Sequence, residues 1–188
     1  MSLDRMIERI AELQNATVAG LDPKLSYIPE YIRDKAVKEH GKTLEAAAAA
    51  VLRVLPDVDL LKISDEEADM LGGEEAIPAL MRENGVSVVI ETLGSRGARC
   101  YWNGKILRID GLKADCVDTC GAGDAFWGGF LSTLLLAGAR TPDALTEALL
   151  LQAMRRGNIA GWLCVQKKGA IESLPTAQEV ERYGKELY

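Results

Sequence analysis

Hydrophobic positions along the chain follow two alternating periods. Runs of consecutive apolar residues, typical of buried strands, occur at 17–21, 58–63 and 86–93. Elsewhere apolar positions recur every three or four residues, which predicts helices at 4–13, 29–41, 43–55, 65–71, 74–84, 125–136, 143–156 and from 175 onward. Because strands alternate with helices, the pattern predicts an α/β fold with a mainly parallel sheet.

Turn residues refine this picture. Asn103-Gly104 separates two strand-like segments, 99–102 and 105–109, and this dipeptide is the strongest short hairpin signal. In open α/β sheets, ligands bind at the carboxyl ends of the parallel strands. We therefore expect the loops 64–67, 94–97 and 118–124 to meet at one end of the sheet.

Composition narrows the class of protein. The 188 residues are 48% hydrophobic and 27% charged, which is ordinary for a globular domain, and the net charge is −6. This charge argues against a nucleic-acid or anionic-membrane partner, and no apolar run reaches the about 18 residues of a membrane span. Four cysteines without a C-x-x-C pair and a single histidine argue against a zinc site. We expect a cytoplasmic protein with reduced thiols.

The segment Gly121-Ala122-Gly123-Asp124 is the strongest candidate for chemistry. It precedes an apolar helix, and its small residues let backbone N–H groups approach an anion at the positive end of that helix. Such a cradle suits a phosphoryl group in transfer, and Asp124 could accept a proton from the attacking hydroxyl. The alternative is a glycine-rich turn whose aspartate only caps the helix. No Walker A motif occurs in the chain.

Longer matches give this segment a family. Residues 117–126, Val-Asp-Thr-Cys-Gly-Ala-Gly-Asp-Ala-Phe, resemble the signature of the ribokinase-type (PfkB) carbohydrate kinases. Residues 62–67 resemble that family's Asn-x-x-Glu region in the serine-bearing version common among fructokinases, with Ser64 in place of the commoner asparagine. Residues 92–98, 158–160 and 168–175 resemble its nucleotide-contacting turn, adenine-side helix and C-terminal Gly-Ala loop. The resemblance implies a partial ribokinase-like three-layer sandwich over residues 53–188.

The resemblance also implies roles for individual residues. Asp124 would be the catalytic base, with an anion hole formed by the backbone of Gly121, Ala122 and Gly123. ATP would contact Thr92, Gly94, Gly97 and Asn158. Glu67 would organise Mg²⁺ through water, and a monovalent cation, K⁺, would lie near Asp118, the Cys120 carbonyl and Ser173 in the 169–173 loop.

Simpler interpretations of the same residues stay open. Ser64 and Glu67 form the pattern of a capping box, which by itself explains both residues. Asp118 could be a turn residue at a strand end, and Cys120 is expected to be packed and unreactive.

The N-terminal segment, residues 1–52, resembles another family. Gly20-Leu21-Asp22-Pro23 and the residues around it are similar to the start of orotidine 5′-phosphate decarboxylases. That family's Asp/Lys catalytic cluster has no counterpart here, so decarboxylation is not expected. We predict a mostly helical N-terminal appendage, helix-strand-helix, joined near residue 52 to the kinase-like region. No counterpart of the kinase family's sugar-binding half precedes Val58.

Three functional hypotheses follow. The first is a truncated, fructokinase-like kinase that transfers the γ-phosphoryl group of ATP to the hydroxyl of a small sugar. The second is a nucleotide-binding remnant without catalysis. The third is a structural product of a fusion, whose unprotected strand edges pair into a homo-oligomer.

Overall fold

The structure is a computed structural model that describes residues 34, 38 and 55–187. The elements in chain order are η2 (Leu55–Asp57), β1 (Leu60–Ser64), α4 (Asp65–Met70), α5 (Ile77–Asn84), β2 (Val88–Thr92), η3 (Gly94–Arg96), β3 (Ala98–Trp102), β4 (Lys105–Ile109), α6 (Ala122–Leu136), η4 (Pro142–Ala144), α7 (Glu147–Cys164) and α8 (Ala177–Leu187). The predicted N-terminal appendage and the elements predicted at 4–13, 17–21 and 43–52 lie outside the described residues.

The four described strands form one mixed sheet in the order β1-β2-β3-β4. β1 and β2 are parallel, with Ser64 opposite Thr92, and α4 and α5 make the crossover between them. β2 with β3 and β3 with β4 are antiparallel. The turn between β3 and β4 has positive φ at Asn103 (47°) and Gly104 (72°), which confirms the predicted hairpin.

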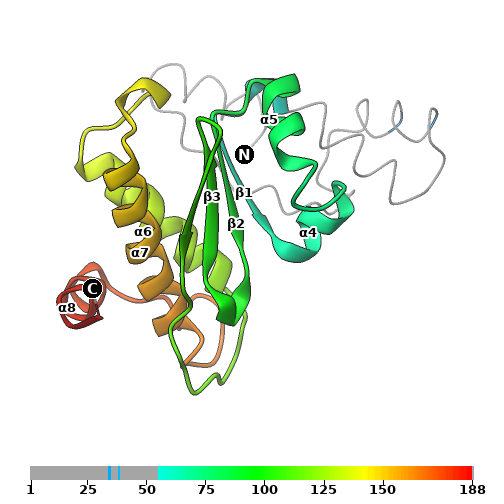
Figure 1. Cartoon of the computed structure of the whole chain (residues 1–188). Helices are drawn as coiled ribbons and strands as arrows, with labels where there is room; N and C mark the ends of the chain where they lie inside the picture. The colour runs from blue at the N-terminus through cyan, green and yellow to red at the C-terminus, as the bar shows by residue number, and fades with distance from the viewer. Residues whose placement is uncertain (1–33, 35–37, 39–54, 188) are drawn as a thin grey trace.

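Helices cover both faces of the sheet (Figure 1). α4 and α5 cover one face, where their apolar residues pack with Ile63, Val89 and Tyr101. α6 and α7 cover the other face and pack on Val88, Ile90 and further residues of β3 and β4. Strand alternation explains this division, because neighbouring residues of β2 point to opposite faces. The predicted three-layer α/β arrangement is confirmed.

α6 and α7 lie in direct backbone contact. A Cβ atom added at Gly129 would lie 2.8 Å from the Arg156 carbonyl oxygen, and one added at Gly157 would lie 2.7 Å from that of Phe126. α7 therefore continues to Cys164, where the sequence predicted an end at Arg156, because Gly157 allows close packing instead of ending the helix. Its start is at Glu147, not 143, because the Thr146 hydroxyl accepts a hydrogen bond from Leu149 N (3.2 Å) and caps the helix there.

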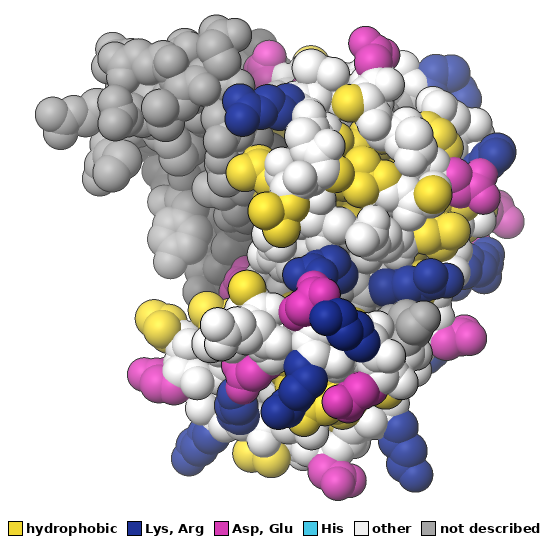
Figure 2. All heavy atoms as spheres, turned by 90° about the vertical axis from the view of Figure 1, so that its left-hand side faces the viewer, with side chains coloured by type: hydrophobic (Ala, Val, Ile, Leu, Met, Phe, Trp, Pro, Cys, Tyr) yellow, Lys and Arg dark blue, Asp and Glu magenta, His cyan; other side chains and the backbone are white. Residues whose placement is uncertain are grey.

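The outer face of α6–α8 carries charges of both signs. Arg156 pairs with Glu181 (2.6 Å) and Lys167 with Glu179 (3.5 Å), which links α8 to α7 and to the residues after it. Figure 2 shows basic and acidic side chains interspersed over the described part of this face. No helix of the described residues is long and apolar enough to cross a membrane.

Candidate active site

The first turn of α6 lies beside the end of β1. Gly121 adopts φ 79° and forms the N-cap, and Ala125 N donates to its carbonyl (2.8 Å). Asp124 is in the first helical turn and is exposed to solvent. A Cβ atom at Gly121 would lie 3.0 Å from the Ala170 carbonyl oxygen, so the glycine also lets the 169–173 loop approach. The predicted glycine cluster is thus a helix N-terminus with an exposed carboxylate and free space for an anion.

A lysine that the sequence analysis did not select faces this helix N-terminus. The Nζ atom of Lys62, on β1, lies 3.2 Å from the position that a Cβ atom at Gly123 would occupy. The two residues are far apart in the sequence, and no local motif indicates that they meet. The alternation of β1 offers only a weak signal, since a lysine on a covered sheet face is uncommon.

The carboxyl end of β1 carries the predicted capping box. Ser64 N and Oγ donate to Glu67 Oε2 (2.7 and 3.1 Å), and Glu67 N donates to Ser64 Oγ (3.2 Å). The capping interpretation of these residues is confirmed. Neighbouring Thr92, at the end of β2, donates from Oγ1 to the Ile63 carbonyl (3.3 Å). Ser64, Glu67 and Thr92 therefore lie at the same end of the parallel strand pair.

The turn after β2 is fixed by close backbone packing. Leu93 N donates to the Gly97 carbonyl (2.8 Å), and Gly94 and Gly97 both have positive φ, 57° and 99°. A Cβ atom at Gly97 would lie 2.1 Å from the Ile109 carbonyl oxygen, and one at Gly111 would lie 2.0 Å from that of Ser95. Two loops thus interlock through glycines directly beside Thr92.

Asn158 of α7 fixes the segment that follows β4. Its Nδ2 donates to the Asp110 carbonyl (3.0 Å), and the side chain is 9% exposed. The predicted role of Asn158 near an adenine is not tested by this contact, which positions the loop packed against the 94–97 turn.

The predicted cation-site residues meet in one cluster. Asp118 Oδ1 accepts from Cys120 N and its Oδ2 from Gly169 N, both at 3.0 Å. These two backbone donors lower the pKa of Asp118 to about 2. Buried Ser173 donates to the Ala170 carbonyl (3.0 Å) and lies 3.0 Å from Cys164 Sγ, which in turn donates to the Cys120 carbonyl (3.5 Å). Asp118 is thus more than a turn residue, since it joins segments 51 residues apart.

Cys120 differs from its predicted environment. The residue is exposed and not packed, because its carbonyl and not its thiol points into the cluster. A hydrogen bond to Asp118 raises the pKa of the Cys120 thiol, which keeps it protonated and unreactive, as predicted. No disulfide occurs in the part of the chain that the structure describes.

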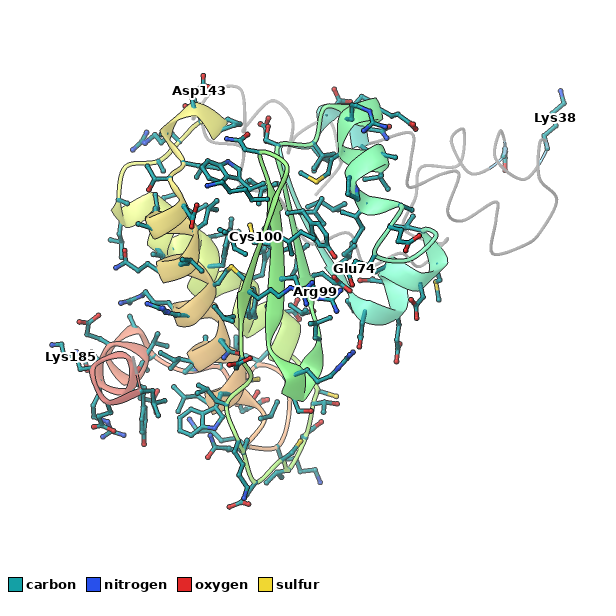
Figure 3. All side chains as sticks on the ribbon, in the orientation of Figure 1. Lys38, Glu74, Arg99, Cys100, Asp143 and Lys185 are labelled. Carbon is teal, nitrogen blue, oxygen red and sulfur yellow. The ribbon has the colours of Figure 1, made fainter. Side chains whose placement is uncertain are left out.

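Two further polar features lie away from the glycine cluster. On the α4/α5 side, buried Glu91 accepts from Tyr101 Oη (2.8 Å) and Arg99, and Arg99 also pairs with Glu74 (Figure 3). At the opposite end of the sheet, a cavity of about 750 Å³ is bordered by α5, the β3–β4 hairpin and η4. It includes none of the predicted site residues. Among the described residues, no three His, Cys, Asp or Glu side chains are grouped to hold a metal ion.

Comparison with known proteins gives this geometry its relatives. The profile of the pfkB family carbohydrate kinases matches residues 33–177. Probable fructokinase-4 of Arabidopsis thaliana is 34% identical over 142 residues, which are 73% of this chain and 42% of that protein. Ribokinase of Haemophilus influenzae is 34% identical over 193 residues, 94% of this chain and 59% of that protein.

A solved structure shows the same likeness in three dimensions. The fructokinase of Vibrio cholerae O395, crystallised with fructose, ADP and a calcium ion, matches with a TM-score of 0.64 and 29% identity over 73% of this chain and 44% of that one. The predicted ribokinase-like α/β fold is confirmed. The chain spans 42% of the length of the Arabidopsis relative. The decarboxylase resemblance of residues 1–52 is not supported, and the kinase match extends into that segment.

Proposed function

This chain belongs to the pfkB family of carbohydrate kinases, and on that premise we propose that it acts in the transfer of the γ-phosphoryl group of ATP to a sugar hydroxyl. One observation carries the proposal: the Gly-Ala-Gly-Asp helix N-terminus lies at the carboxyl end of β1, next to Lys62 and the 169–173 loop. Phosphoryl transfer depends chiefly on positioning and on electrostatic stabilisation, which this arrangement supplies.

The reaction assigns a task to each group at the N-terminus of α6. The exposed carboxylate of Asp124 takes the proton of the attacking sugar hydroxyl, and the helix dipole favours its ionised form. The N–H groups at Gly121, Ala122 and Gly123 face the oxygens of the phosphoryl group as their charge develops. Positive φ at Gly121 opens this turn and admits the 169–173 loop.

Nucleotide and cation contacts surround this centre. ATP lies along Thr92, Gly94 and Gly97, with its adenine toward Asn158 of α7. Glu67 holds water bound to Mg²⁺, whose charge offsets that of the phosphates. Its donor set fits indirect binding, because Oε2 already accepts two hydrogen bonds from Ser64. Oxygen donors at Asp118, Cys120 and Ser173 suit K⁺ and would fix the loop before α6.

Fructose is the substrate that we favour. Two fructokinases are among the relatives, one of them crystallised with fructose, and Ser64 matches the serine-bearing version of the motif. The alternative is a nucleotide-binding chain without turnover. It is favoured by the coverage of 42% of the Arabidopsis fructokinase, which leaves the sugar contacts to be supplied from outside residues 55–187.

A coupled assay of ADP release tests both candidates. The full chain is assayed with MgATP and fructose, ribose or no sugar, together with Asp124→Asn and the control Asp143→Asn. Asp143 is an exposed carboxylate of η4, at the far end from the glycine cluster (Figure 3). We expect sugar-dependent turnover that Asp124→Asn reduces by a factor of at least about 100 and that the control preserves.

Other outcomes choose between the candidates. ATP binding without turnover for any sugar would establish the nucleotide-binding alternative. Turnover that persists in Asp124→Asn would refute the assignment of the base. A folded chain that neither binds ATP nor turns it over would refute both candidates.

A further inference from the structure

Lys62 is placed unusually for a lysine. In β1 it points to the same side of the sheet as Leu60, which packs on the core cluster beneath α6 and α7. Its side chain is half-buried, and its ammonium group reaches Gly123 in the first turn of α6. Nothing in residues 55–187 forms a hydrogen bond or ion pair with it, whereas Lys105, Lys167 and Lys185 each pair with a glutamate.

The surroundings of this ammonium group are electrostatically unfavourable as they stand. The N-terminus of a helix carries about half a positive charge, so α6 and Lys62 present like charges to each other. Asp124, in the same turn, lies beyond ion-pair distance of Lys62, since the structure has no such pair. An anion between the ammonium group and the backbone N–H groups would satisfy both at once.

We propose that Lys62 is a catalytic residue that binds the phosphoryl group during its transfer, opposite the N-terminus of α6. This inference rests on the proposed function and adds to it a residue that the glycine signature does not contain. The flexible four-carbon stem and three rotatable donors of a lysine suit a group that moves between two oxygens.

The transfer step with this residue is balanced. The bond between the γ-phosphorus and the oxygen bridging to ADP breaks, and its electron pair leaves with ADP. A bond forms between the phosphorus and the sugar oxygen, whose proton passes to Asp124. Lys62 keeps its protons throughout and stabilises the equatorial oxygens of the phosphoryl group.

Because ADP lacks the γ-phosphoryl group, the two nucleotides report separately on this contact. We would measure dissociation constants of MgATP and MgADP by calorimetry on the full chain, for the unmodified protein, Lys62→Met and Lys105→Met. Methionine keeps the length of the lysine stem without its charge. Lys105, at the other end of β4, pairs with Glu147 on the surface and makes the matched control for loss of one positive charge.

We expect Lys62→Met to weaken ATP binding at least about tenfold and to leave ADP binding within about twofold. Lys105→Met should change neither, and Lys62→Arg should retain most of the preference for ATP. Equal weakening of both nucleotides, or no change in either, would overturn the role of Lys62 while leaving the proposed function intact. An unmodified chain that binds neither nucleotide would overturn the proposed function itself and the inference with it.

Discussion

Replacement of Gly97 by alanine tests how tightly the loop after β2 is interlocked with the segment after β4. Gly97 has φ 99° and ψ −135°, a backbone conformation that side chains other than hydrogen rarely allow. The added methyl carbon would lie 2.1 Å from the Ile109 carbonyl oxygen and 2.7 Å from both Asp110 C and Gly111 N. All three atoms belong to the backbone, so no side chain can rotate away to make room.

Two costs add at this position. Holding alanine at this backbone conformation costs about 1–3 kcal/mol. Relieving the overlap means moving backbone in a packed region, for which overpacking costs of about 1–3 kcal/mol are typical. We therefore expect Gly97→Ala to lower the free energy of unfolding by about 3–5 kcal/mol, a large part of the about 5–15 kcal/mol of an ordinary domain.

Gly94→Ala is the matched control. Gly94 lies in the same turn with φ 57°, but an added Cβ atom meets nothing within 4 Å. Its expected cost is only the about 1–2 kcal/mol of a left-handed alanine. Urea unfolding followed by circular dichroism gives both values under identical conditions. If Gly97→Ala costs no more than Gly94→Ala, the interlocked packing of these two loops is refuted.

Two further substitutions test other contacts. Tyr101→Phe removes a donor to Glu91, which is 4% exposed, and should lower the free energy of unfolding by about 1–3 kcal/mol; in urea unfolding, an equal effect of Tyr183→Phe would contradict this. Asp118→Asn should lower the melting temperature by a constant amount above about pH 5. Because folding lowers the pKa of Asp118 from 3.8 to about 2, its stabilisation is complete above the unfolded-state value and is lost as the pH falls through the folded value. The difference should therefore shrink below pH 4, and a difference that persists to pH 2 would exclude this linkage.

Local signals in the sequence predicted the elements that local physics determines. Asn103-Gly104 predicted its hairpin, because positive φ is needed at both positions and these residues tolerate it. Ser64 and Glu67 predicted their capping box, since the contacts span three residues. The helix after the glycine cluster was predicted from its apolar run, although the structure starts it earlier, at Ala122.

Features that depend on tertiary contacts were not predictable in this way. Gly157 reads as a helix breaker in isolation, but it continues α7 because the Phe126 carbonyl occupies the space of a side chain. The contact of Lys62 with Gly123 and the link from Asp118 to Gly169 join distant segments without a shared periodicity. For Asp118 and Ser173, family resemblance predicted what periodicity did not, namely that they belong to one region.

The glycine contacts between α6 and α7 have a mechanical consequence. Helices separated by side chains can slide as rotamers change, but here each helix meets the other's carbonyl oxygens without such a cushion. The contact continues to the first turn of α6, where a Cβ atom at Gly161 would lie 3.2 Å from the Ala122 carbonyl oxygen. The pair therefore moves as one stiff strut. Any opening that admits a nucleotide or releases a product must come from the parts that surround this strut, while the cradle at its tip keeps its shape.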